Sequence, residues 1–218
     1  FIIEIFKKKK AYGANYNKKN YNIEFVSANP TGPMHVGHCR GAIYGDVLSN
    51  LFRFNGNEVV KEYYINDYGN QIKNFTKSVF LRIREIKFNE KFINDVDLYP
   101  GEYIIDIANK IISEKKKINY DNFEHSYELL SKESLKFSMK LITDDLEKLG
   151  IKHDIFFSET DLIKKNLVVN TIDLLKKNNF VEEAYLKPPK GEEKKNWKKI
   201  KRLIFKSTLF GDDTDRAL

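Results

Sequence analysis

Two histidines three residues apart are placed where they could handle phosphate groups. His35 and His38 stand in the string PMHVGH, residues 33–38, where a helical pattern opens near His35. Residues three apart lie on one face of a helix, so both imidazole N–H groups can point at the same group. The first turn of a helix also favours anions through its free backbone N–H groups and its dipole. We therefore predict that the pair donates hydrogen bonds to phosphoryl oxygens.

The elements around this string are those that a nucleotide site requires. The apolar run 23–26 predicts a strand that stops at Ser27, and Pro30 and Pro33 hold an extended turn before the helix. Ligands of an open parallel sheet bind beyond the carboxyl ends of its strands. The order of strand, turn and helix therefore places residues 27–38 at such an edge and predicts a nucleotide site there.

Other interpretations of these residues remain open. A His-x-x-His pair can be half of a metal site, but His125 and His153 lack the spacing of further ligands, so no metal site is expected. The two histidines could also be packed in a core. Gly37 can leave a flat surface for a purine ring beside the helix backbone, or it can serve simple helix packing.

Four ordered strings resemble one protein family. The string HVGH, residues 35–38, resembles the HIGH signature of class I aminoacyl-tRNA synthetases, and EFVSANPTGP, residues 24–33, resembles the arginyl-tRNA synthetase version of it. Three further strings resemble later blocks of that family: EYYINDYGNQ at 62–71, YPGEYI at 99–104 and FGDDTDR at 210–216. Because the strings are long and span most of the chain, the chain is identified by this resemblance as a member of the family.

The resemblance implies which residues hold the substrates. The residues it implies for ATP are Pro33, His35, Gly37 and His38, with His35 and His38 as the catalytic pair. The residues it implies for arginine are Glu24, Ser27 and Asn29. Their chemistry suits that ligand, because a guanidinium group can satisfy both oxygens of a carboxylate and short polar groups suit the α-amino and carboxylate ends. Glu24 can alternatively be an outward-facing strand residue, and Asn29 can merely fix the turn before Pro30.

Two other blocks contribute residues with less specific roles. The resemblance implies that four residues after the second strand shape the crevice: Asn66, Asp67, Gly69 and Gln71. An ordinary strand-to-helix turn would use the same residue types. Near the end of the chain, Asp212, Asp213 and Asp215 either cap a turn or bind Mg²⁺ indirectly.

Composition bounds the class of protein. The chain has 218 residues with 38 basic and 31 acidic side chains, a net charge of +7 that suits a polyanionic partner without proving one. Cys39 is the sole cysteine, so an intramolecular disulfide is excluded and a reducing, cytoplasmic setting is expected. No run approaches the roughly 20 apolar residues that cross a bilayer, so we expect no membrane partner.

The periodicity predicts an α/β fold. Strands 23–26 and 58–65 flank a helix whose apolar residues have the spacing of a buried stripe, and the unit has the length of a right-handed parallel crossover. The residues of this stripe are Val36, Ile43, Val47, Leu51 and Phe54. Helical patterns follow from 70, over 103–115 and over 135–149, where Gly150 is placed as a stop. A strand at 155–157, a helix over 161–177 and a hairpin of 180–186 with 203–208 complete the prediction.

This pattern and the resemblance together predict the organisation of the chain. Residues 1–20 are expected to be a short helix and a polar linker, the remnant of a preceding domain. Residues 21–218 are expected to form the N-terminal half of a Rossmann-like class I catalytic domain. Within it, a helical insertion is expected at about 72–130 and a β-hairpin insertion at about 180–208.

The function implied by the resemblance is that of an arginine–tRNA ligase. Such an enzyme activates arginine with ATP and Mg²⁺ to arginyl-adenylate and transfers it to tRNA(Arg), without a redox cofactor or structural zinc, and the parent enzyme is expected to be monomeric. The chain has no Lys-Met-Ser-Lys loop, so alone it is expected to be inactive. Two alternatives remain: a truncated, non-catalytic paralogue that binds ATP or RNA, and another nucleotidyltransferase with an H-x-G-H motif.

Overall fold

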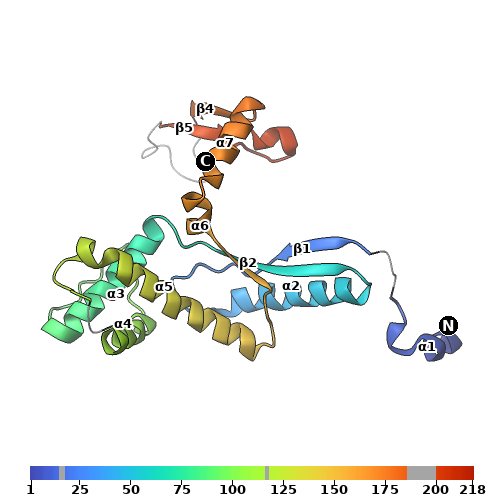
Figure 1. Ribbon diagram of the computed structural model, residues 1–218, viewed down its shortest axis with the longest axis horizontal. Coiled ribbons are helices and arrows are strands. Elements are labelled where there is room, and N and C mark those ends of the chain that lie inside the picture. Colours follow the sequence, from blue (N-terminus) through green and yellow to red (C-terminus); the bar gives the residue numbers. More distant parts are fainter. Residues whose placement is uncertain (15–17, 116–117, 186–199) are drawn as a thin grey trace. The chain divides into compact units, whose positions relative to one another are not determined.

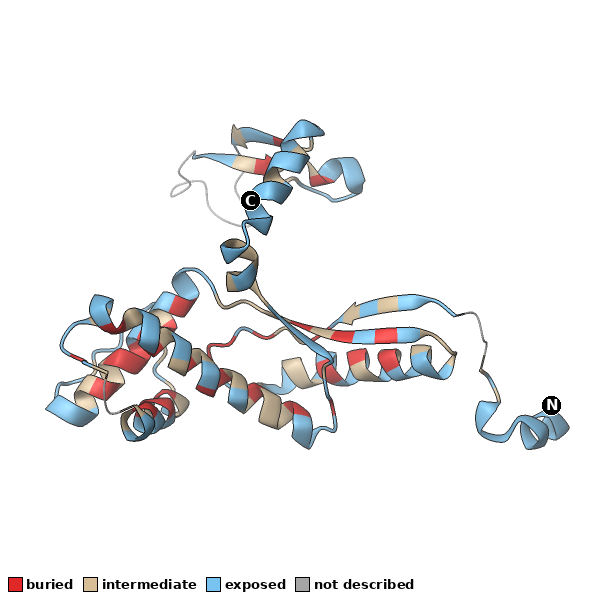
Figure 2. Ribbon diagram, in the orientation of Figure 1, coloured by how far each residue is buried: buried red, intermediate tan, exposed pale blue. Residues whose placement is uncertain are grey.

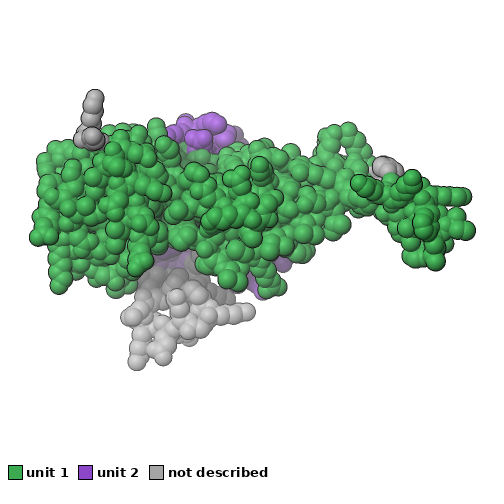
Figure 3. Space-filling model, turned by 90° about the horizontal axis from the view of Figure 1, so that it is seen from below, with its two compact units in different colours: residues 1–160 green, residues 161–218 purple. Residues whose placement is uncertain are grey.

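The computed structural model describes residues 1–14, 18–115, 118–185 and 200–218. The chain divides into two compact units, residues 1–160 and 161–218, which Figure 3 shows in different colours. None of the helices among the described residues is long and apolar enough to cross a membrane.

A three-stranded parallel sheet organises the first unit. Its strands are β1 (Asn20–Glu24), β2 (Glu58–Ile65) and β3 (Ile155–Ser158), in the order β1-β2-β3. The strands run parallel, so their carboxyl ends point to one edge of the sheet. The last residues of β2 and β3, Ile65 and Ser158, are paired there, whereas β1 ends earlier, at Glu24 opposite Glu62. Helix α2 (Val36–Phe54) connects β1 to β2 (Figure 1). The predicted parallel crossover is thus confirmed, and with it the α/β class.

Helix α2 buries small residues instead of the predicted apolar stripe. Its buried positions are Ala42, Gly45 and Ser49. Figure 2 shows the buried parts of α2 on its side toward β2. A Cβ atom at Gly45 would lie 2.2 Å from Cγ of Phe25, so the helix approaches the β1 chain too closely for larger side chains. The prediction of a buried stripe is therefore wrong. The five residues of that stripe are all exposed: Val36, Ile43, Val47, Leu51 and Phe54.

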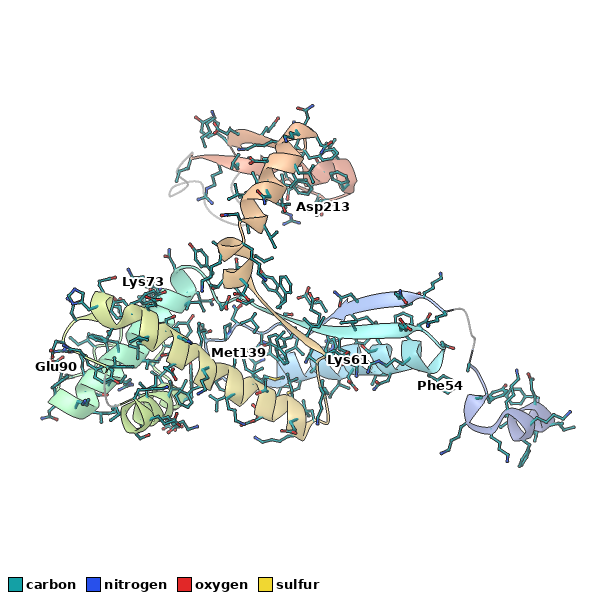
Figure 4. The ribbon with its side chains drawn as sticks, viewed as in Figure 1. Phe54, Lys61, Lys73, Glu90, Met139 and Asp213 are labelled. Atoms are coloured by element: carbon teal, nitrogen blue, oxygen red, sulfur yellow. The ribbon has the colours of Figure 1, made fainter. Side chains whose placement is uncertain are left out.

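A buried lysine fastens α2 to the sheet. Lys61 of β2 is 5% exposed and lies between the sheet and α2 (Figure 4). Its Nζ donates to Oδ1 of Asp46 at 2.5 Å and to Oδ1 of Asn50 at 3.2 Å, both on α2. A charge removed from water requires such partners, so this network fixes the helix in one position on the sheet.

The first strand begins and ends earlier than predicted. It covers Asn20–Glu24 and not 23–26, because Val26 and Ser27 have φ values of 69° and 40°, which no strand accommodates. Asn20, predicted to lie in the linker, is its first residue. The segment before it contains α1 (Ile2–Lys8) and the 3₁₀ helix η1 (Lys9–Ala11), so the predicted short helix is present.

Three helices between β2 and β3 share a core of their own. They are α3 (Asn70–Phe88), α4 (Glu102–Glu114) and α5 (Phe123–Lys148), and they lie together to one side of the sheet (Figure 1). Phe75, Ile83 and Ile107 are among its fully enclosed side chains. The last two turns of α5 instead contribute Ile142 and Leu146 to the core beneath the sheet. Helix α5 therefore joins the helical group to the sheet, and it ends before Gly150 (φ +73°) as predicted.

The second unit contains a small antiparallel sheet of β4 (Val181–Tyr185), β5 (Lys201–Phe205) and β6 (Arg216–Ala217), with the 3₁₀ helix η3 (Ser207–Phe210) before β6. The pairing of β4 with β5 confirms the predicted hairpin, whereas β6 was not predicted. Most of the stretch 187–201 lies outside the described residues. The single helix predicted over 161–177 is wrong: Asn166 (φ 56°) separates α6 (Glu159–Lys164) from α7 (Leu167–Lys177).

Candidate functional site

His35 and His38 form a stacked pair at the first turn of α2. His35 is the N-cap residue, and its Nδ1 accepts a hydrogen bond from the Gly37 backbone N at 3.1 Å. The Nδ1 atom of His38 accepts from the backbone N of His35 at 3.3 Å. The ring centroids lie 3.7 Å apart and the rings are nearly parallel, at 18°. His35 is exposed and His38 half-buried, so neither ring is sealed in a core.

These hydrogen bonds determine where each ring carries its proton. A backbone N–H can only donate, so each Nδ1 is the acceptor and each neutral ring carries its proton on Nε2. Burial, and then the charge of His35, lower the pKa of His38 below its usual 6.5. His38 is therefore neutral at neutral pH and presents an Nε2–H donor at the start of a helix, where the dipole favours an anion.

Gly37 leaves room for this capping arrangement. A Cβ atom at this position would lie 3.0 Å from Cε1 and 3.1 Å from Nδ1 of the His35 ring. The ring would have to move away from the Gly37 backbone N–H that it accepts from. Glycine at position 37 therefore allows His35 to serve as the cap. The predicted role of Gly37 as a flat surface for a purine ring stays a prediction.

A strained turn holds the predicted arginine-binding residues Glu24 and Ser27. Val26, a β-branched residue, and Ser27 both have positive φ, a conformation that costs free energy and must be held by contacts. Ser27 Oγ donates to Oε1 of Glu24 at 2.7 Å and accepts from the backbone N of Tyr64 at 3.0 Å. Glu24 is exposed, which agrees with the alternative that it is an outward-facing strand residue. The hydrogen bond from Ser27 fixes one of its carboxylate oxygens at the end of β1.

The crevice residues are brought together only in part. Asn66 Nδ2 donates to Oδ1 of Asn29 at 3.3 Å, so the loop after β2 meets the loop after β1. Asp67 instead binds the start of α6, accepting from Ser158 Oγ at 2.7 Å and from the backbone N of Thr160 at 2.8 Å. The other two residues, Gly69 and Gln71, are exposed at the start of α3, and Pro33 is exposed in the loop before α2.

Glu159, a carboxylate directly after β3 at the start of α6, was not identified from the sequence. Burial and the nearby charge of Asp67 raise the pKa of Glu159. The pKa of Tyr64 is raised by its burial and then by the charges of Glu159, Asp67 and Glu24. The carboxyl edge of the sheet thus carries a negative potential, which favours a cation. The signal available in the sequence was the position of Glu159 directly after a strand.

The acidic string near the end of the chain has structural partners. Asp212 accepts from Nε and Nη2 of Arg216 at 2.8 and 2.9 Å, which lowers the pKa of Asp212 to about 2. Asp215 accepts from the backbone N and the hydroxyl of Thr208 at 3.1 and 2.8 Å. These contacts fit the capping alternative. Among the described residues, no group of three or more His, Cys, Asp or Glu side chains could hold a metal ion.

Comparisons with known proteins agree with the four strings. The family described as tRNA synthetases class I (R), catalytic domain, matches residues 2–185. Arginine–tRNA ligase of Pelagibacter ubique (strain HTCC1062) is 56% identical over 221 residues, which cover 100% of this chain and 38% of that protein. The enzyme of the same name from Ehrlichia ruminantium (strain Welgevonden) is 48% identical over 225 residues, with the same coverage. The chain thus spans 38% of the length of these relatives.

Solved structures agree on the fold. A crystal structure of a Campylobacter jejuni protein assigned as an arginyl-tRNA synthetase superimposes with a TM-score of 0.77 at 28% identity, covering 98% of this chain and 43% of that one. The arginyl-tRNA synthetase of Thermus thermophilus has a TM-score of 0.56 at 17% identity and covers 94% of this chain and 34% of its own. At that identity the second likeness supports the fold alone.

Proposed function

Because this chain belongs to the family of class I tRNA synthetase catalytic domains for arginine, we propose that it is part of an arginine–tRNA ligase. In the full-length protein it would activate arginine with ATP and transfer the arginyl group to the terminal ribose of tRNA(Arg). The observation that carries the proposal is the stacked pair of His35 and His38, with both Nδ1 atoms occupied by backbone N–H groups. Each ring thereby keeps its Nε2–H for a ligand.

The chemistry of activation requires donors of this kind. The arginine carboxylate attacks the α-phosphorus of ATP in line, and negative charge grows on the phosphoryl oxygens and the departing pyrophosphate. Two Nε2–H groups at the N-terminus of α2 would stabilise that charge. Rings held by capping hydrogen bonds need little rearrangement at the transition state, which is where such donors act. Pro33 and Gly37 would border the same nucleotide.

The amino acid would bind at the carboxyl ends of β1 and β2. Glu24 would accept from the guanidinium group, since one of its oxygens is already oriented by Ser27. Asn29 would meet the α-amino and carboxylate end, oriented by its contact with Asn66. The charges of Asp67 and Glu159 add to the attraction for a cationic side chain.

The remaining substrates and the setting follow from the same proposal. Mg²⁺ would enter with ATP, bound through phosphate oxygens, as hard cations that retain several waters generally are. No redox cofactor or structural zinc has a place in this chemistry. We propose that the parent enzyme is cytoplasmic and monomeric. The net charge of +7 on this chain would attract the polyanionic tRNA.

The test is arginine-dependent exchange of pyrophosphate into ATP by the full-length protein with its tRNA. We expect exchange with arginine alone among the amino acids, and a loss of about 100-fold or more in kcat for His35→Ala and for His38→Ala. The matched control is His125→Ala, because His125 is exposed at the start of α5 and should leave the rate unchanged. Exchange driven by another amino acid would contradict the proposal. ATP binding without any exchange would favour the non-catalytic paralogue.

A further inference from the structure

The string YPGEYI, residues 99–104, lies outside the residues assigned to the substrates. It leads into α4, with Gly101 as the N-cap residue and Tyr103 in the first turn. One end of the block is fastened to α3. The backbone N of Tyr99 donates to Ser78 Oγ at 2.9 Å, and Arg82 Nη2 donates to the Pro100 carbonyl at 3.2 Å. The block is therefore held rigidly against the helical group.

Its other end reaches the loop that precedes the histidines. The Tyr103 hydroxyl donates to the backbone carbonyl of Thr31 at 2.9 Å. A Cβ atom at Gly32 would lie 3.1 Å from both Cζ and Oη of Tyr103, so the phenol packs directly on the Gly32 backbone. Thr31 is only 8% exposed and Tyr103 is half-buried, so water has limited access to this hydrogen bond. A side chain at Gly101 would also strike the ring, at 2.4 Å.

The phenol is a donor throughout the physiological pH range. Burial, followed by the proximity of Tyr99, raises the pKa of Tyr103 to about 12. A second phenol acts in the same way from the sheet, because Tyr63 Oη donates to the Ala28 carbonyl at 2.8 Å. The loop between Ala28 and Thr31 is thus held from two sides, by β2 and by α4. It follows the strained turn at Val26 and leads to His35.

We propose that Tyr103 is a positioning residue for the nucleotide site. By holding the Thr31 carbonyl and the Gly32 backbone, it fixes the loop that carries Asn29 at one end and Pro33 and His35 at the other. The helical group α3–α5 thereby sets the geometry with which the arginine and ATP sites face each other. The expected effect of Tyr103 on catalysis rests on the proposed function. Its expected effect on the order of the loop rests only on the hydrogen bond to Thr31.

The kinetic test compares two tyrosines of the same helical group in the full-length enzyme. Tyr103→Phe removes a hydroxyl that donates to the loop, whereas Tyr120→Phe removes a buried hydroxyl that has no hydrogen-bond partner among the described residues. We expect Tyr103→Phe to lower kcat of pyrophosphate exchange about three- to tenfold and to raise the KM for ATP. Tyr120→Phe should leave both constants at the wild-type values. Wild-type constants in Tyr103→Phe, or equal losses in the two variants, overturn the inference.

A second measurement does not depend on the reaction. Hydrogen exchange of the backbone amides in residues 28–38 reports how firmly the loop is held. We expect the backbone amides of this segment to exchange their hydrogens faster in Tyr103→Phe and at the wild-type rate in Tyr120→Phe. If the wild-type enzyme shows no arginine-dependent exchange of pyrophosphate, the proposed function fails while this measurement still judges the role of Tyr103. Unchanged protection of residues 28–38 in Tyr103→Phe refutes it.

Discussion

Lys61 Nζ and Asp46 Oδ1 lie 2.5 Å apart between β2 and α2, with side-chain exposures of 7% and 17%. Removing one partner leaves the other charge buried and uncompensated, which typically costs several kcal/mol. We predict that Asp46→Ala lowers the free energy of unfolding by about 3 kcal/mol, measured by urea denaturation. Replacing both residues together, as Lys61→Met with Asp46→Leu, should recover most of that loss, because the pair is then exchanged for apolar packing.

The matched control is an exposed pair of the same chemistry. Lys152 Nζ and Glu147 Oε1 lie 3.9 Å apart with side-chain exposures of 80% and 71%. Exposed pairs contribute little because water and salt screen them. Lys152→Met should therefore change the stability by less than about 0.5 kcal/mol. A similar loss of unfolding free energy in Asp46→Ala and Lys152→Met would contradict the prediction, because the burial of Lys61 would then not explain the loss.

Replacing two glycines of α2 by alanine should change the stability of the protein in opposite directions. A Cβ atom at Gly45 would overlap the Phe25 ring, so Gly45→Ala must displace either α2 or the Phe25 side chain and should lower the free energy of unfolding by about 1–3 kcal/mol. Gly41 has open space around it, so Gly41→Ala should raise the free energy of unfolding by about 0.5–1 kcal/mol, because alanine has the better helix propensity. Urea denaturation of the two variants gives the comparison. Equal effects would show that α2 does not pack on Phe25 as described.

The parts of the fold that sequence could predict are those set by local pattern. The range of β2, Glu58–Ile65, follows directly from its β-branched and aromatic residues, and α3 from its apolar period. The end of β1 could not be found in this way. Val26 was predicted to be the last strand residue, but contacts from distant elements, such as the Tyr64 backbone N–H that binds Ser27, hold Val26 and Ser27 at positive φ. Propensity was overridden by tertiary structure.

The face of α2 was predicted wrongly for a related reason. The large apolar residues of this helix, such as Ile43 and Val47, suggested the buried side, but close packing on Phe25 selected Ala42 and Gly45 instead. At the site, one continuous string supplied the two histidines, and the structure places both at the first turn. Glu159 was missed, and Tyr103 was found only as part of the string at 99–104 without a role, because both come to the site from elements far along the chain. The substrate roles of all these residues stay predictions.

The stability of the first unit should fall as the pH falls below neutrality, through His153. Its ring lies 4.3 Å from the Phe25 ring, and burial is the main cause that lowers its pKa below 6.5. The unfolded chain then binds a proton more readily than the folded chain, so stability is full above pH 6.5 and declines as the pH falls through the folded pKa. His153→Gln should flatten this decline in urea denaturation between pH 7 and pH 5, whereas the exposed His125→Gln should leave it unchanged.

In the proposed site, Ser27 would link the stability of the strained turn after β1 to the binding of arginine. Ser27→Ala leaves the Tyr64 backbone N–H without its acceptor and releases Glu24, so it should cost about 1–2 kcal/mol of unfolding free energy. In the full-length enzyme the KM for arginine should rise several-fold while the KM for ATP changes little, since only Glu24, the carboxylate proposed to bind the guanidinium group, loses its orientation. Ser113→Ala, at an exposed position of α4, should affect neither quantity. Equal increases in the two KM values would mean that Ser27 supports the whole site and not Glu24.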